Sequence, residues 1–557
     1  MTHKNLPLPP RFRPAASVRV LALFLCSLSG LLLTALPSQA AESDASEAPA
    51  AQAAAPAAVQ FEVLEYRVIG NSVLQNRDIE GVLYPRLGPH KTFADIDAAR
   101  EALEVAYHAM GYATVFVDVP PQEVSDGIVR LHVTEGKLRE RTISGARYFS
   151  ESKLLAELPA TQPGTVPKIS ELQNELTAAN SQSADRSVIP VLKAGPVPGT
   201  MDLALKVDDH LPLHGGLELD NQYTADTDPL RATASLSYSN LFEELDSIAA
   251  QFTTTPQKPS EVAVLSLNYE FHPLGAGVRP SVSFTNSSSN VVTVGTLGVL
   301  GDGQIVSARL LMPMFQGVGE LQSLTAGLDY KHFHNTINLA GIGAQIEPMT
   351  YVNLSLSYAG LWQRLSASGQ PLESGSVDVA ANVGPRGPTN SAYDFDSSRF
   401  EARGNYAYLH WDMSFSSPLP AGLQLTLRLV GQEALEPLVV YEQQSFAGSQ
   451  GVRGYLEAEV LADSGYKGTL QLQSPSWVRG AKRWGDAFIF FDAAQSRSID
   501  ALPGEPDLTN LHSIGAGLDL LPGQNVTGTL TWAEPLMPGP HTARHESRLL
   551  FDMKGSF

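Results

Sequence analysis

Residues 407–415 read Ala-Tyr-Leu-His-Trp-Asp-Met-Ser-Phe, and residues 352–358 read Val-Asn-Leu-Ser-Leu-Ser-Tyr. Apolar and polar side chains alternate through both stretches. In the first, one face holds Leu409, Trp411, Met413 and Phe415, and the other holds Tyr408, His410, Asp412 and Ser414. Successive side chains of a β-strand point to opposite faces of its sheet. Each stretch therefore predicts a strand with one apolar and one polar surface.

The alternation continues through the C-terminal part of the chain. Residues 265–271 and 423–429 repeat it, and helical periodicity is absent after about residue 213. Strands of a soluble β-sandwich also alternate, but here the apolar faces carry few charges over a long region. At roughly 10 residues per membrane strand plus connections, that region accommodates about 16 strands. We therefore predict that residues 211–557 form an antiparallel transmembrane β-barrel, with a soluble β-domain as the alternative.

The composition supports this interpretation and excludes two other classes of protein. The chain has 557 residues, of which 43% are hydrophobic and 17% charged, with a formal net charge of −20. The charged fraction is low, since about a quarter is usual for a soluble protein. Only residues 20–36 form an apolar run of helix length, which argues against a helical membrane protein. The acidic balance argues against a nucleic-acid partner, which requires a clustered basic surface.

The N-terminus has the pattern of a secretory signal peptide. Three arginines between residues 11 and 19 precede the apolar run 20–36. Ser38 and Ala40 supply the small residues that a signal peptidase requires. We therefore predict a signal peptide at residues 1–40, with a single membrane anchor as the alternative.

The predicted mature chain is more acidic and contains no cysteine. Cleavage removes four basic residues and no acidic one, which changes the net charge from −20 to −24. Cys26 is the only cysteine, and Leu25 stands before it where a lipidation motif requires a small residue. A secreted chain without cysteine is stabilised by packing and hydrogen bonds, with no disulfide to contribute.

Two mixed α/β units precede the predicted barrel. Residues 41–60 are rich in alanine with Pro49 and Pro56, a composition typical of a flexible tether. From residue 61, hydrophobic periodicity and turn signals indicate the order β-α-α-β-β, beginning with a strand at residues 61–69. On the second helix, Ile96, Ala99, Leu103, Tyr107 and Met110 fall on one face. The same order recurs more loosely from residue 138. We predict two units, residues 61–137 and 138–210, each with a sheet covered by two helices.

Several short motifs occur in a fixed order along the chain. They are Pro121-Gln122-Glu123-Val124-Ser125-Asp126-Gly127 leading to Val133-Thr134-Glu135-Gly136; Pro198-Gly199-Thr200-Met201-Asp202-Leu203; Asn240-Leu241-Phe242 before Asp246; Val452-Arg453-Gly454-Tyr455 within residues 448–466; and Phe490-Phe491-Asp492-Ala493-Ala494. Together they resemble the transporters of two-partner (type Vb) secretion, the haemolysin secretion/activation family of the POTRA-plus-barrel superfamily. The resemblance covers about residues 61–557 and implies that both α/β units are POTRA domains.

The chain departs from the family pattern at two places. Ala494 closes the last motif, where the family has glycine, and this small side chain still leaves the lumen side uncrowded. Family members often carry a plug helix and a linker before the first POTRA domain. The 41–60 tether has hardly room for both, which argues against a plug helix.

The resemblance also predicts a functional site inside the barrel. It implies that a loop around residues 445–466, with the motif Val452, Arg453, Gly454 and Tyr455, folds back into the barrel. On the wall strand, Phe490, Asp492 and Ala494 share one face, and an Asp that faced lipid would be costly, so this face should line the lumen. The family implies a salt bridge between Arg453 and Asp492. The alternative is that Arg453 is a surface-loop charge and Asp492 one of many lumen acids.

The end of the chain resembles an assembly signal. Leu549, Phe551, Met553 and Phe557 fall on one alternating face, and Phe557 is the last residue of the sequence. A terminal aromatic residue on a final amphipathic strand resembles the signal by which barrel-assembly machinery recognises outer-membrane proteins.

By resemblance, the chain is a translocation pore in the outer membrane of a Gram-negative bacterium. Its periplasmic POTRA domains would capture one large exoprotein by adding it to a sheet edge. The barrel would then pass that partner outward unfolded. The main alternative is a barrel-assembly or insertion factor of the same superfamily, which usually has three or more POTRA domains. POTRA domains that act only as spacers, and a plain porin, are further alternatives.

Motifs of enzymes and metal sites are missing from the sequence. It has no Gly-x-Ser-x-Gly elbow, His-Glu-x-x-His helix or phosphate-binding glycine loop, so we predict no catalytic residues and no cofactor. Asp394 and Asp396 begin like a calcium loop, but Arg399 stands where the turn requires glycine, so we interpret this stretch as a polar loop. Without a mature cysteine, a structural Cys/His zinc site is excluded, and we predict no metal site.

Overall fold

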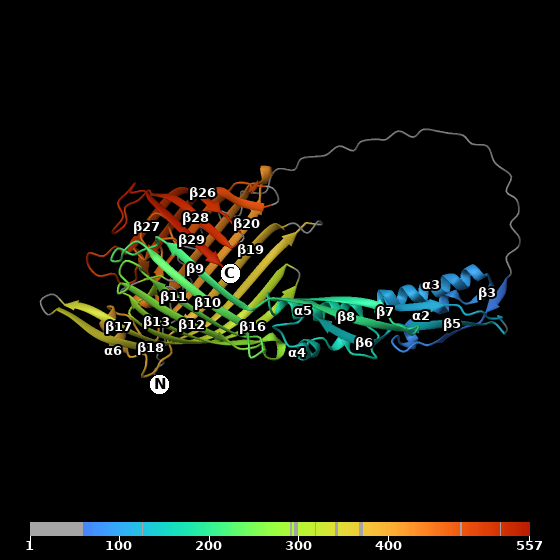
Figure 1. Ribbon diagram of the computed structural model, residues 1–557. Helices are drawn as coiled ribbons and strands as arrows, with labels where there is room; N and C mark the ends of the chain where they lie inside the picture. The colour runs from blue at the N-terminus through green and yellow to red at the C-terminus, as the bar shows by residue number, and fades with distance from the viewer. Residues whose placement is uncertain are drawn as a thin grey trace, which may run out of the picture. The chain divides into compact units, whose positions relative to one another are not determined.

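The computed structural model describes residues 60–124, 126–289, 292–293, 299–317, 319–339, 343–366, 371–479, 482–523 and 525–557 (Figure 1). The predicted signal peptide, residues 41–59 of the predicted tether, and Ser125 of the first motif lie outside these ranges. Within them, no helix is both long and apolar enough to cross a membrane.

The first α/β unit differs from the predicted order in two ways: its first strand is divided in two, and a short strand at Gly88–Lys91 lies between the two helices. Its elements are β1 (Phe61–Val63), β2 (Glu65–Ile69), α2 (Asn76–Leu83), β3 (Gly88–Lys91), α3 (Phe93–Ala109), β4 (Val115–Asp118) and β5 (Ile128–Glu135). The sheet has the order β2-β5-β4, with β2 parallel and β4 antiparallel to β5. The short strand β1 pairs separately with β3. The predicted 61–69 strand is therefore interrupted at Leu64.

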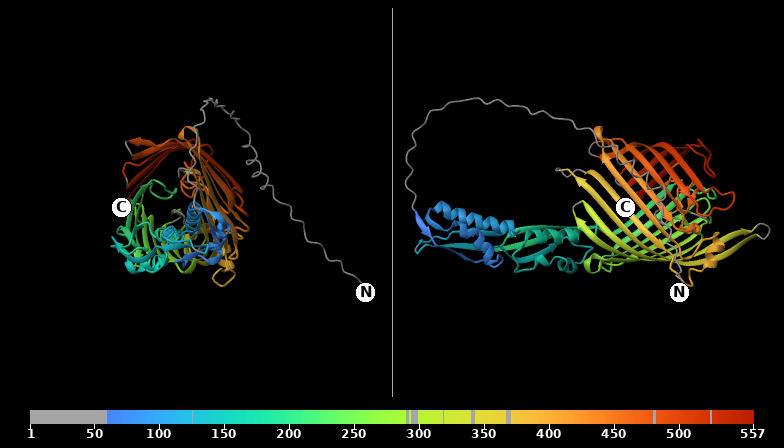
Figure 2. Two further views of the ribbon diagram at one scale, coloured as in Figure 1. Left: turned by 90° about the vertical axis from the view of Figure 1, so that its right-hand side faces the viewer. Right: turned by 180° about the vertical axis from the view of Figure 1, so that it is seen from behind.

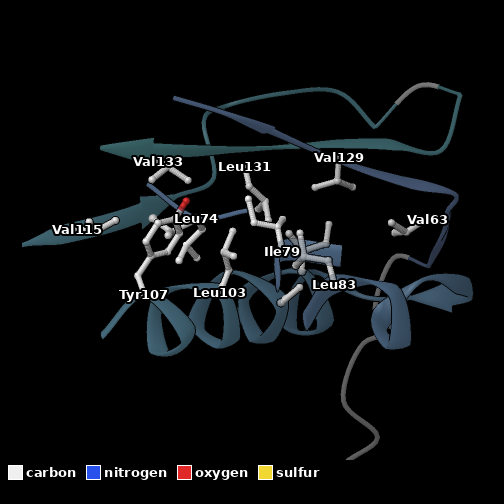
Figure 3. Close-up of a cluster of buried hydrophobic side chains, with 13 residues drawn as sticks. Val63, Leu74, Ile79, Leu83, Leu103, Tyr107, Val115, Val129, Leu131 and Val133 are labelled. Atoms are coloured by element: carbon white, nitrogen blue, oxygen red, sulfur yellow. The ribbon is translucent and has the colours of Figure 1, made fainter. Parts of the chain in front are cut away.

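The core of this unit lies between helix α3 and the sheet (Figure 3). Ile96, Ala99, Leu103 and Tyr107 on α3 are at most 3% exposed. The helix begins with a capping box, in which Thr92 and Asp95 exchange hydrogen bonds. Met110, which the sequence places on the same face, is 40% exposed because the helix ends at Ala109.

The second α/β unit repeats the topology of the first. Its elements are β6 (Lys137–Ser144), α4 (Glu151–Ala156), α5 (Ile169–Ser181), β7 (Arg186–Ala194) and β8 (Thr200–Asp209). The sheet order is β6-β8-β7, with β6 parallel and β7 antiparallel to β8. Its own hydrophobic core joins the two helices to the sheet, through residues such as Leu154, Leu176 and Leu205.

Except for two short pairs in the loops, Val292–Thr293 with Val299–Leu300 and Gln444–Ser445 with Leu461–Ala462, the remaining strands close into an antiparallel barrel (Figure 2). They are β9 (Leu213–Asp220), β10 (Arg231–Leu241), β11 (Asp246–Thr254), β12 (Val262–Glu270), β13 (Arg279–Ser289), β16 (Gly303–Gly317), β17 (Glu320–Leu339), β18 (Gly343–Leu365), β19 (Pro371–Val383), β20 (Ala407–Pro418), β21 (Gln424–Ala434), β24 (Ser464–Gln473), β25 (Trp477–Arg479), β26 (Lys482–Arg497), β27 (Leu508–Leu520), β28 (Val526–Pro535) and β29 (Arg548–Ser556). Both β24 and β25 pair with β26, so they form one interrupted strand, and the barrel in the described residues has 16 strands. The predicted fold class is confirmed.

The two faces of the barrel wall differ as the alternation predicts. On β20, Leu409, Met413 and Phe415 are 41–42% exposed and face outward. Ser414 lies on the opposite face, where its hydroxyl is 2.7 Å from that of Ser376 on the neighbouring strand β19. The outer surface is therefore apolar and the inner surface polar, which suits a wall between lipid and water.

The last strand pairs with the first and closes the barrel. Residues 552–556 of β29 pair with residues 216–220 of β9. Beyond β29, Phe557 and Gly215 exchange backbone hydrogen bonds of 3.0 and 3.2 Å. The Phe557 ring occupies the space next to Gly215 where a Cβ would clash, and it remains 71% exposed. Its role as an assembly signal stays a prediction.

Strand directions define the two ends of the barrel. Strand β9 follows directly from the second α/β unit, and each later strand runs opposite to its neighbour. Strands β19, β21, β26 and β28 therefore run away from that connection. The loops that follow them, residues 384–406, 435–463, 498–507 and 536–547, lie at what we call the distal end.

Candidate functional site

The loop between β21 and β24 carries the predicted in-folding motif. Its central turn is held by backbone hydrogen bonds, since Val452 N–H donates to the Phe446 carbonyl and Gly448 N–H to the Val452 carbonyl. Ala447 and Val452 also form an isolated parallel bridge. Gly448 and Gly454 both have φ of +97°, a backbone conformation that glycine adopts without strain. The glycine-rich stretch therefore forms a compact turn, as its composition suggests.

The structure brings Arg453 and Asp492 together in the bidentate geometry of a strong ion pair. Arg453 Nε lies 2.8 Å from Asp492 Oδ2, and Nη2 lies 2.9 Å from Oδ1. The backbone N–H of Arg453 also donates to Oδ2 at 3.1 Å. The Asp492 side chain has no exposed surface, and that of Arg453 is 15% exposed. The pair therefore fixes both the position and the orientation of the loop against strand β26.

Wall residues next to Asp492 complete the arginine site. The guanidinium carbon of Arg453 lies 3.4 Å from the ring centroid of Phe490, close enough for a cation–π interaction. Arg453 Nη1 donates to Gln471 Oε1 on β24 at 3.2 Å. Phe490 is 5% exposed, whereas its neighbours Ile489 and Phe491 are 57% and 42% exposed. The face with Phe490 and Asp492 is thus the inner face of the wall.

The other motif residues attach the loop to the same part of the wall. Tyr455 donates its hydroxyl to the carbonyls of Met537 at 2.7 Å and His512 at 3.2 Å. Val452 is fully buried, in a cluster with Tyr455 and Ala494. A Cβ added to Gly454 would lie 3.2 Å from both Ala533 and Pro535, so glycine permits the close approach. Ala494, where the family has glycine, is accommodated in the cluster at 4% exposure.

The motifs of the α/β units have structural roles of their own. The buried Glu135 accepts hydrogen bonds from the backbone of Ser72 and Val73 and so holds the turn after β2. Asp202 forms a bidentate pair with Arg139, at 2.8 and 2.9 Å. These contacts explain why the motifs contain an acidic residue at those positions.

The Asn240 motif joins the second α/β unit to the barrel. Asn240 Nδ2 donates to the Tyr148 carbonyl at 2.8 Å, and Asn240 Oδ1 accepts from Leu245 N–H at 3.1 Å. Ser239 donates to Asp185 at 2.5 Å, and Lys153 pairs with Glu244. The turn between β10 and β11 is therefore the docking point for this unit.

Several residues of the site were not predicted from the sequence. Gln471 and the cation–π contact are two of them, although Phe490 precedes Asp492 by two residues on the same strand and therefore shares its face. The stretch predicted as a polar loop instead places Asp394 and Asp396 in helix α6 (Ala392–Ser398). Arg399 instead pairs with Asp463 at the foot of the in-folding loop. Among the described residues, no group of three or more potential ligands could hold a metal ion.

Comparisons with known proteins agree with this architecture. Residues 199–518 match the family model of the haemolysin secretion/activation protein ShlB/FhaC/HecB, and residues 61–136 match that of the ShlB-type POTRA domain. The outer membrane transporter CdiB of Dickeya dadantii is 23% identical over 380 residues, 67% of this chain and 64% of that protein. The chain thus spans less than two thirds of that relative. CdiB of Escherichia coli O6:K15:H31 is 21% identical over 84% of this chain and 78% of its own length.

Solved structures show the same fold. CdiB from Escherichia coli superposes with a TM-score of 0.61 at 17% identity, over 90% of this chain and 91% of that chain. BamA from Haemophilus ducreyi, lacking its first three POTRA domains, gives a TM-score of 0.56 at 13% identity, over 89% of this chain and 100% of that chain.

Proposed function

Because the chain belongs to the haemolysin secretion/activation protein ShlB/FhaC/HecB family, we propose that it is an outer-membrane pore that exports one exoprotein. The α/β units capture the exoprotein in the periplasm, and the barrel passes it outward unfolded. The observation that carries the proposal is the loop fixed to the inner wall by the buried Arg453–Asp492 pair. A loop held against the inner wall of a closed barrel obstructs a polar passage until those contacts are released.

The α/β units supply sheet edges for capture, parts of which already bond to their own unit. On β4 the Val117 N–H donates to Glu104, and on β7 the Val188 N–H donates to Asn180. In the first unit β2 and β4 are the edge strands, and in the second β6 and β7 are. An extended peptide can pair with such an edge through backbone hydrogen bonds that demand little of its sequence. Strand β7 is the longest of the four, but Pro190 at its centre lacks an N–H and limits pairing there. We therefore place capture on both units together rather than on one edge.

The remaining partners follow from the location in the outer membrane. The apolar outer face of the barrel contacts lipid, and barrel-assembly machinery recognises the strand that ends near Phe557. The chain acts as a transporter and catalyses no reaction. Transport draws its direction from the exoprotein, which folds after it has left the barrel.

The rival function, insertion of other barrels into the membrane, has less support. The family match takes in more than half of this chain and belongs to the secretion family. The likeness to BamA is one of fold alone at 13% identity. In the described residues, two α/β units precede the barrel, whereas three or more POTRA domains are usual in insertion factors.

Loss of the gene tests the proposal in cells. We expect a deletion strain to retain the exoprotein encoded by the neighbouring gene in its periplasm. Plasmid-borne expression of the full chain should restore the exoprotein to the medium, as measured by immunoblots of both fractions. Other outer-membrane barrels should keep their normal abundance. Normal export in the deletion strain, or a general loss of barrels, would contradict the proposal, and the second result would favour the insertion factor.

A further inference from the structure

A second buried carboxylate lies at the foot of the in-folding loop. The Asp463 side chain has no exposed surface. Its oxygens accept hydrogen bonds from the backbone N–H groups of Leu438 at 2.9 Å and Ile499 at 2.7 Å. Gln443 donates its side-chain amide at 3.2 Å. Asp463 therefore binds both ends of the 435–463 loop and the neighbouring 498–507 loop.

The charge of Asp463 is balanced by an arginine from a third loop. Both terminal nitrogens of Arg399 donate to the two Asp463 oxygens, with Nη2 at 2.7 Å from Oδ2. Arg399 Nη2 also donates to the Ile499 carbonyl at 3.1 Å, and Nη1 donates to the Leu438 carbonyl. Arg399 follows helix α6 directly and belongs to the distal loop 384–406. We call this ion pair the Arg399–Asp463 latch.

Loop 384–406 packs its apolar side chains against the foot of the in-folding loop. Phe395 and Ala402 are 1% and 2% exposed, in a cluster that includes Leu438 and Tyr441. Rings from the wall strands, such as Tyr351, complete the cluster. The Arg399–Asp463 latch therefore lies beside a buried apolar contact between loop 384–406 and loop 435–463.

A neighbouring carboxylate anchors the same foot to the barrel wall. The Glu442 side chain is 1% exposed and pairs with Lys331 on β17. It also accepts from the hydroxyls of Tyr351 on β18 and Tyr408 on β20, both at 2.7 Å. Glu442 thus binds the loop to the fixed wall, whereas Asp463 binds it to a second loop.

We propose that the Arg399–Asp463 latch couples the distal loop 384–406 to the in-folding loop, so that neither moves outward without the other. Arg399 and Asp463 are positioning residues that act through Arg453 and its loop. The inference rests on the proposed export function, because its purpose is to close the barrel mouth until the exoprotein displaces the in-folding loop. Coupling of this kind is reciprocal, since each loop must influence the other by the same free energy.

A cysteine introduced into the distal loop 384–406 reports whether that loop has moved outward. Cys26 is the only cysteine of the chain and lies in the predicted signal peptide, so the processed chain is a cysteine-free background. Ala402→Cys then places one thiol in the buried contact, and a maleimide reagent added to intact cells labels it only when the loop lifts. We expect Arg399→Ala to raise the labelling rate of this thiol more than tenfold. Arg399→Lys keeps the charge but not the two-pronged geometry and should give an intermediate rate.

A substitution in the in-folding loop tests whether the coupling acts in both directions. Arg453→Ala releases the in-folding loop at its other end, and we expect it also to raise labelling at Ala402→Cys several-fold. The matched control is Arg279→Ala, which removes an ion pair with Glu270 between two neighbouring wall strands, β12 and β13, and contacts neither loop. It should leave labelling within twofold of the parent. Each variant is first shown to be folded by the heat-dependent mobility shift of intact barrels on gels.

Two results would overturn the proposal. One is unchanged labelling in Arg399→Ala, and the other is a response to Arg399→Ala without any response to Arg453→Ala. The labelling needs no exoprotein, so these failures leave the export function standing. Conversely, a chain that shows the coupling but exports nothing would refute the function and not the latch.

Discussion

Arg453→Ala should reduce export of the exoprotein at least tenfold while the barrel still assembles. The substitution leaves Asp492 fully buried without its cation, which typically costs about 3–5 kcal/mol. Because the loss falls on the loop contact and not on the strand ladders, the loop leaves its position and the closed wall remains. Export is measured as the ratio of exoprotein in the medium to exoprotein in the cell, and assembly by the mobility shift of the folded barrel.

Two further variants serve as controls for this prediction. Arg279→Ala removes another ion pair between two wall strands, away from the in-folding loop, and should export normally. Arg453→Lys should export partially, because an ammonium group retains the charge but cannot bind both Asp492 oxygens in parallel. Normal export by folded Arg453→Ala would contradict the assignment of the site.

Deletion of residues 61–136 should abolish capture of the exoprotein. These residues hold every helix and strand of the first unit, and all the buried residues of its core lie in this range. The second unit retains its contacts with the barrel through Asn240 and Ser239, so the remainder should assemble. Binding of the exoprotein's N-terminal domain to the purified full and shortened chains is measured by surface plasmon resonance.

We expect the shortened chain to bind at least a hundredfold more weakly than the full chain. A shortened chain that is folded and binds with unchanged affinity would transfer capture to the second unit or to the barrel. Loss of the mobility shift would show that the deletion prevents assembly, and a purified 61–136 fragment that fails to bind would then contradict the capture role directly.

The sequence predicts the barrel well because its information is local. Alternation at Leu409, Met413 and Phe415 requires only that a strand have one face in lipid, and the exposures agree. Element ends are less accurate, because they depend on caps and on neighbouring segments. The strand break at Leu64 and the interruption between β24 and β25 depend on tertiary pairing that no local pattern records.

For the site as well, local patterns could be predicted from the sequence and long-range pairs could not. The Arg453–Asp492 pair could be anticipated only because the flanking motifs resemble those of a known family. Residues without such motifs were missed, since Arg399 and Asp463 are 64 positions apart and belong to different loops. Nothing in the composition of either loop selects one partner among several charges. The resemblance thus supplies the missing information on long-range contacts only at positions that belong to a family motif.

The central claim, that the exoprotein crosses through the barrel lumen, is tested most directly by site-specific photocrosslinking to a stalled exoprotein. Adjacent positions on β20 offer a matched pair, since Ser414 faces the inside and Met413 faces the membrane. A photoreactive side chain is placed at each position in turn, and export is halted by a stably folded domain fused to the exoprotein's C-terminus. We predict crosslinks from position 414 and none from position 413. Crosslinks from position 413 with none from position 414 would contradict passage through the lumen.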